Sequence, residues 1–183
     1  MRSFYKISNL LPADDALLKN DVFLVMLYAT RVPPHLLVSV NGKIFTLSVK
    51  GATVDGELPA LLQLIRKKRI ETVFIRLTLP PLFTFDQLKA EMRNCILAYP
   101  RAEIGIATCL TPINDFCHYI YETEKKNVNL IFDLLPKLQQ RNVIGDYYQM
   151  NLDKNIVGNS FRLNVYQVND VHEAIRNSSL AMA

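Results

Sequence analysis

The sequence has few cysteines, few glycines and no long apolar run, and each shortage excludes a class of protein. Its three cysteines, Cys95, Cys109 and Cys117, form neither a disulfide framework nor a Cys-x-x-Cys motif, so we expect free thiols. The six glycines include no glycine-rich phosphate loop, which leaves a nucleotide cofactor unsupported. Apolar stretches such as residues 22–29 are far shorter than the roughly 18 to 20 residues of a membrane-spanning helix, so no membrane span is expected.

What the sequence does contain is typical of a globular protein. Of its 183 residues, 50% are hydrophobic and 21% are charged, a balance that excludes a disordered, collagenous or low-complexity chain. No linker rich in Gly, Ser or Pro divides the sequence, and domains commonly run roughly 100 to 200 residues, so we expect a single domain over residues 1–183. The first residues are polar where an export signal would be apolar, which predicts a cytoplasmic protein.

Charge identifies no partner. The 21 basic residues exceed the 17 acidic ones by only four, a mild excess for a protein that binds phosphate backbones. The basic run Arg66-Lys-Lys-Arg69 could contact nucleic acid or an acidic membrane, but the last turn of an ordinary helix also favours cations. Cys109, Cys117 and His118 lack the pairwise spacing of a zinc site, so no metal is expected. Oligomeric state has no signature in the sequence.

Hydrophobic periodicity indicates an α+β fold, with a mainly antiparallel sheet or small barrel packed against helices. The expected strands lie at residues 22–29, 35–40, 43–49, 71–79, 103–107 and 161–168. The expected helices lie at residues 12–19, 58–68, 84–98, 129–141, from Thr111 to Tyr121, and in a short segment capped by Asp170 with Glu173. Thr84 and Gln87 form the pattern of a capping box, and Thr111 followed by Pro112 is typical of a helix start.

The clearest local signal is a β-hairpin. Asn41-Gly42 joins HLLVSV to KIFTLSV, and this dipeptide favours the two positive φ angles of a type I′ turn. A two-residue turn pairs Val40 with Lys43. Counting back along both strands places His35 opposite Ser48 and Leu37 opposite Thr46, all on one face.

These residues suggest a thiol nucleophile assisted by an imidazole. A cysteine reacts as its thiolate, which a neighbouring histidine and the positive end of a helix both favour. Cys117 falls in the first or second turn of a predicted helix, His35 on a strand, and Ser48 across the hairpin from His35. We therefore expect Cys117 as the nucleophile, His35 as the base and Ser48 as the residue that orients the imidazole.

Other interpretations of the same residues stay open. Cys109 is the alternative nucleophile, because it lies nearer the helix start, where the dipole lowers a thiol pKa more effectively. Cys117 shares its helical face with Phe116 and other apolar residues and could simply pack in the core. His35 could be an ordinary histidine at the start of a strand. Cys95, His118 and His172 carry no catalytic signal.

The order of these parts resembles the circularly permuted papain-like, or NlpC-like, cysteine hydrolases over roughly residues 21–125. The resemblance is carried by Asp21 before an apolar strand, His35-Leu-Leu-Val, Asn41-Gly42, Leu58 to Lys68, Thr72-Val-Phe-Ile-Arg-Leu, Tyr99 and Phe116-Cys117. The chain departs from the family after the cysteine, where His118-Tyr119 replaces Ser-Glu. It departs again on the second hairpin strand, which offers Thr46 and Ser48 in place of a carboxylate.

The resemblance implies a permuted papain-like fold and a cysteine hydrolase or acyltransferase acting on a small peptide, amide or ester. Cys117 would form an acyl-enzyme, and His35 would act first as general base and then as general acid. Two other functions remain: a non-catalytic interaction domain of the same fold, and, more weakly, a nucleic-acid-associated protein that uses residues 66–69.

Overall fold

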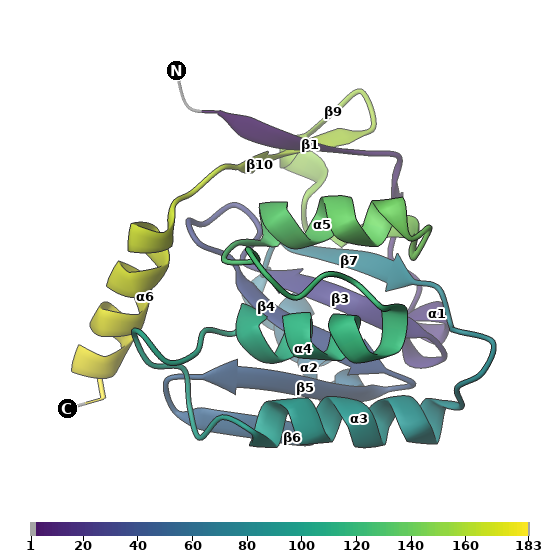
Figure 1. Ribbon diagram of the computed structural model, residues 1–183. Coiled ribbons are helices and arrows are strands. Elements are labelled where there is room, and N and C mark those ends of the chain that lie inside the picture. The colour runs from purple at the N-terminus through teal and green to yellow at the C-terminus, as the bar shows by residue number, and fades with distance from the viewer. Residues whose placement is uncertain (1–2, 183) are drawn as a thin grey trace.

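The computed structural model describes residues 3–182, and within that range the chain forms six α-helices and two mostly antiparallel sheets (Figure 1). The larger sheet has the order β2-β8-β7-β3-β4-β5-β6 and comprises β2 (Leu10–Pro12), β3 (Val22–Leu27), β4 (His35–Val40), β5 (Lys43–Ser48), β6 (Gly51–Glu57), β7 (Thr72–Leu77) and β8 (Ile144–Met150). The smaller sheet comprises β1 (Phe4–Ser8), β9 (Ile156–Val157) and β10 (Ser160–Asn164). The helices are α1 (Asp15–Lys19), α2 (Leu58–Lys68), α3 (Phe85–Leu97), α4 (Leu110–Tyr121), α5 (Ile131–Gln140) and α6 (Val168–Leu180).

The predicted α+β class is confirmed, and the sheet is open. In the described residues the larger sheet ends at β2 on one side and at β6 on the other, so it does not close into a barrel. Its strands pair antiparallel except for β2, which runs parallel to β8. No helix within residues 3–182 is long and apolar enough to span a membrane.

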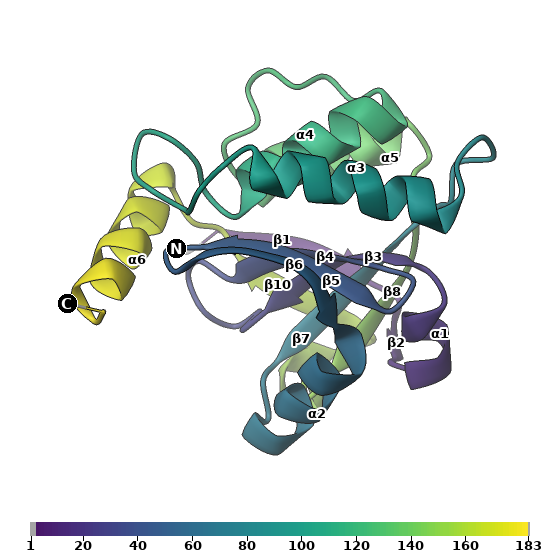
Figure 2. The ribbon, with the colours of Figure 1, turned by 90° about the horizontal axis from the view of Figure 1, so that it is seen from below.

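Helices cover both faces of the larger sheet, and this explains its central strand. Figure 2 shows α3, α4 and α5 on one face and α2 on the other. All six residues of β3 are buried: Leu24 and its alternate neighbours pack toward α3–α5, whereas Phe23 and its alternates pack toward α2. A strand covered on both sides has no polar face, so it reads as a continuous apolar run.

The predicted hairpin is confirmed. Asn41 and Gly42 have φ angles of 46° and 78°, and Val40 pairs with Lys43. The turn thereby aligns β4 with β5 and brings the start of β4, at His35, to the same end of the hairpin as Ser48.

The expected strand at residues 103–107 is wrong. This segment is a loop, which is closed by reciprocal backbone hydrogen bonds between Glu103 and Ala107. Gly105 has a φ of 79°, and Ile104 and Ile106 are exposed. The alternating isoleucines are typical of a strand, but the chain reverses direction at Gly105. No neighbouring strand of the described chain pairs with residues 103–107.

Two predicted helix caps are also wrong, because both helices begin earlier. The helix α4 begins at Leu110 with Cys109 at the N-cap position, and the Thr111 hydroxyl accepts a hydrogen bond from Thr108 N–H at 2.9 Å. Asp170 lies in the first turn of α6 and accepts from the N–H of the N-cap residue Gln167 at 2.6 Å. The earlier start of α4 places Cys109 directly at its positive end.

Candidate active site

A cavity of about 470 Å³ lies where the hairpin, the start of α4 and the helix α6 meet. His35 at the start of β4 and Cys109 before α4 both line it. Loop residues 28–34 close one side, and residues of α6 such as Ile175 close another. In both Figure 1 and Figure 2 the N-terminal end of α4 points toward α6, which agrees with this arrangement.

Thr46 positions the ring of His35, and burial keeps that ring neutral. The Thr46 hydroxyl lies 2.8 Å from Nε2 of His35 and donates its own proton to the Leu36 carbonyl at 3.3 Å. With the Thr46 proton donated to the Leu36 carbonyl, the Thr46 oxygen accepts from Nε2–H of His35, and in this tautomer Nδ1 is the basic nitrogen. Burial lowers the pKa of His35 below its usual 6.5, which keeps the ring neutral at physiological pH.

Cys109 is the thiol that shares the cavity with His35. Its side chain is half-buried at the N-cap of α4. Burial raises the pKa of the Cys109 thiol, and hydrogen bonding from the backbone N–H groups of Leu36, Cys109 and Leu110 acts in the opposite direction. Cys109 and His35 thus line the same cavity, and Leu36 directly follows His35 in β4.

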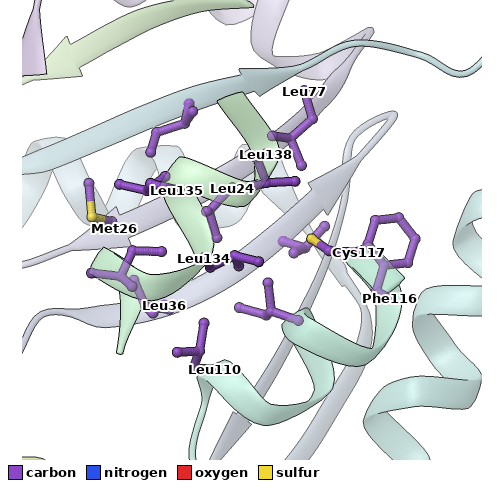
Figure 3. Packing of buried hydrophobic residues seen from close by; sticks show 14 of the residues in the cluster. Leu24, Met26, Leu36, Leu77, Leu110, Phe116, Cys117, Leu134, Leu135 and Leu138 are labelled. Carbon is purple, nitrogen blue, oxygen red and sulfur yellow. The ribbon is translucent and has the colours of Figure 1, made fainter. Parts of the chain in front are cut away.

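Cys117 lies elsewhere, in the core. Its side chain is 0% exposed and it does not line the cavity. Figure 3 shows it within the same packed group as Leu24, Phe116 and Leu134. Burial raises the pKa of the Cys117 thiol far above its usual range, because the apolar surroundings disfavour a thiolate. The structure therefore brings His35 together with Cys109 and not with Cys117.

Ser48 lines the cavity but bonds its own turn instead of the imidazole. Its hydroxyl donates to the Gly51 carbonyl at 3.3 Å and accepts from the Lys50 N–H at 3.2 Å. These contacts close the tight connection between β5 and β6. Thr46 takes the position next to His35 that the sequence had assigned to Ser48.

The remaining candidates have structural environments of their own. Cys95 is buried in α3, where burial and then the Glu91 carboxylate raise its pKa to about 12. His118 Nδ1 lies 2.7 Å from the Thr123 carbonyl, near the end of α4. His172 is half-buried on α6 and does not line the cavity.

The basic residues 66–69 lie at the end of a helix, where cations are ordinarily favoured. Arg66, Lys67 and Lys68 form the last turn of α2, and Arg69 ends the helix in a left-handed conformation. Arg66 forms an ion pair with Asp15 of α1. Among residues 3–182, no group of three His, Cys, Asp or Glu side chains could hold a metal ion.

The sequence interpretation missed Thr46 and the residues of the cavity wall. Thr46 was placed opposite Leu37, yet it reaches His35 diagonally, and such diagonal neighbours lie within reach of a long side chain. That diagonal was the available signal. Nothing in the sequence could connect Arg31 or α6 to the cavity, because those contacts depend on how distant segments pack.

No protein-family model, no curated protein and no solved structure matches this chain.

Proposed function

We propose that this protein is a cysteine hydrolase or acyltransferase that acts on a small peptide, amide or ester, with a permuted papain-like arrangement of its catalytic groups. One observation carries the proposal: Cys109, at the N-cap of α4, shares a cavity with His35, whose ring is held through Nε2 by Thr46. Cys109 is the nucleophile, His35 the general base, and Thr46 the positioning residue.

The first half of the reaction forms an acyl-enzyme. Nδ1 of His35 takes the proton from the Cys109 thiol, and the sulfur attacks the substrate carbonyl carbon. The carbonyl oxygen becomes an oxyanion, which the backbone N–H groups and the positive end of α4 stabilise. The imidazolium then returns its proton to the leaving amine or alcohol, the bond to that group breaks, and a thioester remains.

The second half depends on which acceptor attacks the thioester. Neutral His35 takes a proton from water or from another amine or alcohol, and the resulting nucleophile displaces the sulfur. Water gives hydrolysis, whereas any other acceptor gives acyl transfer. In both cases the Cys109 thiol is regenerated when His35 returns the proton.

The order of the parts supports the permuted papain-like arrangement. The imidazole is on an early strand, the thiol follows it at a helix start, and Asn41-Gly42 forms the hairpin between. Cys109 takes the role for which the resemblance proposed Cys117. Thr46, on the second hairpin strand, supplies an oxygen where the family commonly has a carboxylate.

A non-catalytic interaction domain is the second candidate, and one observation favours it. Burial is the largest influence on the Cys109 thiol and raises its pKa, which opposes thiolate formation in the free protein. In such a domain Cys109 would react no faster than other buried thiols, and replacing His35 would not change its reaction rate.

Thiol alkylation separates the two candidates. We expect iodoacetamide at about pH 7 to label Cys109 faster than Cys95 or Cys117, because only Cys109 is half-buried and lines a cavity with a histidine. His35→Gln should slow labelling of Cys109 by about tenfold or more, since a neutral amide cannot take the thiol proton. Tandem mass spectrometry of the labelled peptide measures each site.

Matched variants complete the test. Cys117→Ala should leave the labelling rate of Cys109 nearly unchanged, whereas Cys109→Ala should remove the fast-reacting thiol. Circular dichroism verifies that each variant is folded. Equal rates for Cys109 with and without His35 would leave the thiol without a general base and would support the non-catalytic domain.

A further inference from the structure

The wall of the cavity has a marked asymmetry of charge. Among the described lining residues Arg31 is the only arginine or lysine, and none is an aspartate or glutamate. The remaining wall is apolar or carries small neutral groups, such as Val49, Thr108 and Ile175. A bound molecule therefore meets one fixed positive charge and no carboxylate.

Contacts with Tyr28 position Arg31, but no carboxylate in the described residues pairs with it. Its guanidinium carbon stacks 4.0 Å from the centroid of the Tyr28 ring, and its backbone N–H donates to the Tyr28 carbonyl at 2.8 Å. Within residues 3–182, other arginines form ion pairs with carboxylates, namely Arg66, Arg76, Arg93, Arg101 and Arg141. Arg31 forms none there, although stacking leaves the edge of its guanidinium able to donate hydrogen bonds.

A second positive influence comes from the start of α4. Cys109 occupies its N-cap, where the helix dipole contributes about half a positive charge. Arg31 and this helix end both face the same cavity. Their fields add, and no acidic side chain of the described lining opposes them.

From these observations we infer that Arg31 is a specificity residue that binds a carboxylate of the substrate, so that the preferred peptide, amide or ester carries one near the bond that Cys109 attacks. A planar guanidinium matches a carboxylate through two parallel hydrogen bonds. A carboxylate carries one negative charge, which one arginine balances, whereas a phosphate carries about −1.5 to −2. The inference rests on the proposed role of Cys109 as the reacting thiol.

A matched pair of small reagents tests the inference. Iodoacetate and iodoacetamide alkylate a thiol in the same way and have similar size, but only iodoacetate carries a carboxylate. The measured quantity is the ratio of their rate constants at Cys109, divided by the same ratio for N-acetylcysteine in the same buffer. We expect this normalised ratio to exceed one by about fivefold at low salt and to fall as salt rises.

Three variants assign the effect to Arg31. Arg31→Gln should bring the normalised ratio close to one, because a change in the reactivity of the thiol itself affects both reagents alike and cancels in the ratio. Arg31→Lys should retain much of the preference, because the charge remains. Arg101→Gln is the matched control: it removes the same charge from the loop before α4, outside the cavity lining, and should leave the ratio unaltered.

The outcomes separate this inference from the proposed function. A reactive Cys109 whose ratio is the same in the wild type and in Arg31→Gln overturns the inference alone. So does protection of Cys109 by inorganic phosphate where acetate gives none. A Cys109 that neither reagent labels faster than the buried thiols overturns the proposed function, and the inference falls with it.

Discussion

At the scale of single residues, Thr46 determines which nitrogen of His35 can act as a base. Its hydroxyl proton is donated to the Leu36 carbonyl, so its oxygen accepts from Nε2 of His35. This arrangement favours the tautomer that carries its hydrogen on Nε2 before any substrate binds. In the proposed reaction this removes a reorganisation step, because Nδ1 already carries the free lone pair.

Burial of His35 also predicts how stability depends on pH. The pKa of His35 is lowered in the folded protein, while the unfolded chain binds the proton near pH 6.5. The unfolded state then holds more protons just below 6.5, so the free energy of unfolding should fall as pH drops from about 7.5 toward the lowered pKa. Urea titrations at several pH values measure this slope.

His35→Gln isolates that contribution. The variant should be less sensitive to pH over the same range, because glutamine does not titrate, while the carboxylates contribute equally to both proteins. The Cys109 thiol, whose pKa is raised, stays neutral throughout. Identical slopes for the two proteins would show that His35 is readily protonated in the folded state.

The sequence alone could not decide whether Cys109 or Cys117 lies beside the cavity. Cys109 and Cys117 are eight positions apart and both belong near one helix start. Deciding between them required the tertiary packing, which buries Cys117 in the core and places Cys109 in the cavity with His35. The helix begins at Leu110, and the N–H of that residue bonds the Thr108 hydroxyl at 3.2 Å. The Thr108 hydroxyl, one residue before the N-cap Cys109, was the overlooked signal for this earlier start.

At the scale of elements, α6 forms a wall of the cavity while carrying no fully buried residue in its described length. Val171 packs against the core only in part, and Leu180 near the end of the helix is 68% exposed. A helix held by so little apolar contact contributes little to the stability of the sheet beneath it. Its described contribution is to the wall of the cavity that Cys109 also lines.

Removing α6 should therefore open the cavity more than it destabilises the protein. A chain ending at Gln167 should lose only about 1–2 kcal/mol of unfolding free energy, because the area that Val171 and its neighbours bury is small. Alkylation of Cys109 by a bulky fluorescein maleimide should accelerate several-fold. Alkylation by small N-ethylmaleimide should change less.

The point variant Asn177→Ala is the control, since it alters the wall and keeps the helix. It should leave both rates close to those of the full chain. A truncated chain that fails to fold, or that reacts with the bulky reagent no faster than the full chain, would contradict this role for α6.

Elements with strong local signals were predictable, and those defined by long-range pairing were not. The range of α2 and the capping box of α3 follow from apolar spacing and from Thr84 with Gln87. By contrast, β6 has the sequence GATVDGE, which lacks an apolar alternation because the strand is an edge with exposed residues. It exists because β5 pairs with it, and a periodicity argument cannot detect a partner.

At the scale of the whole molecule, one sheet is shared by two apolar clusters. The side chains of β3 alternate between the cluster under α3–α5 and the cluster under α2. Melting either cluster exposes one face of the same strand. Unfolding of one cluster should therefore destabilise the other, because both depend on the same strand.

This coupling predicts one cooperative unfolding transition. Leu62→Ala on α2 and Leu134→Ala on α5 should each cost about 2–5 kcal/mol, since both side chains are buried on opposite faces. Each variant should lower the melting temperature of the same single transition. Far-UV circular dichroism and the reactivity of Cys117 with a thiol reagent should report the same midpoint.

An exposed leucine provides the control for these substitutions. Leu82 is 89% exposed, and Leu82→Ala should change stability by no more than about 0.5 kcal/mol. Two separate transitions, each sensitive to only one of the buried leucines, would show that the clusters unfold independently.

The two edge strands of the larger sheet affect how readily the folded protein could aggregate by strand pairing. On one side β2 is three residues long and ends at Pro12, which has no N–H to donate. On the other side β6 pairs with β5 through an irregular register, and its Asp55 is clamped by Arg93 of α3 with N–O distances of 2.9 and 2.8 Å. Because these edge strands are short, irregular or held by an ion pair, the edges of the larger sheet offer a neighbouring chain few backbone groups to pair with and are poor templates for fibril growth.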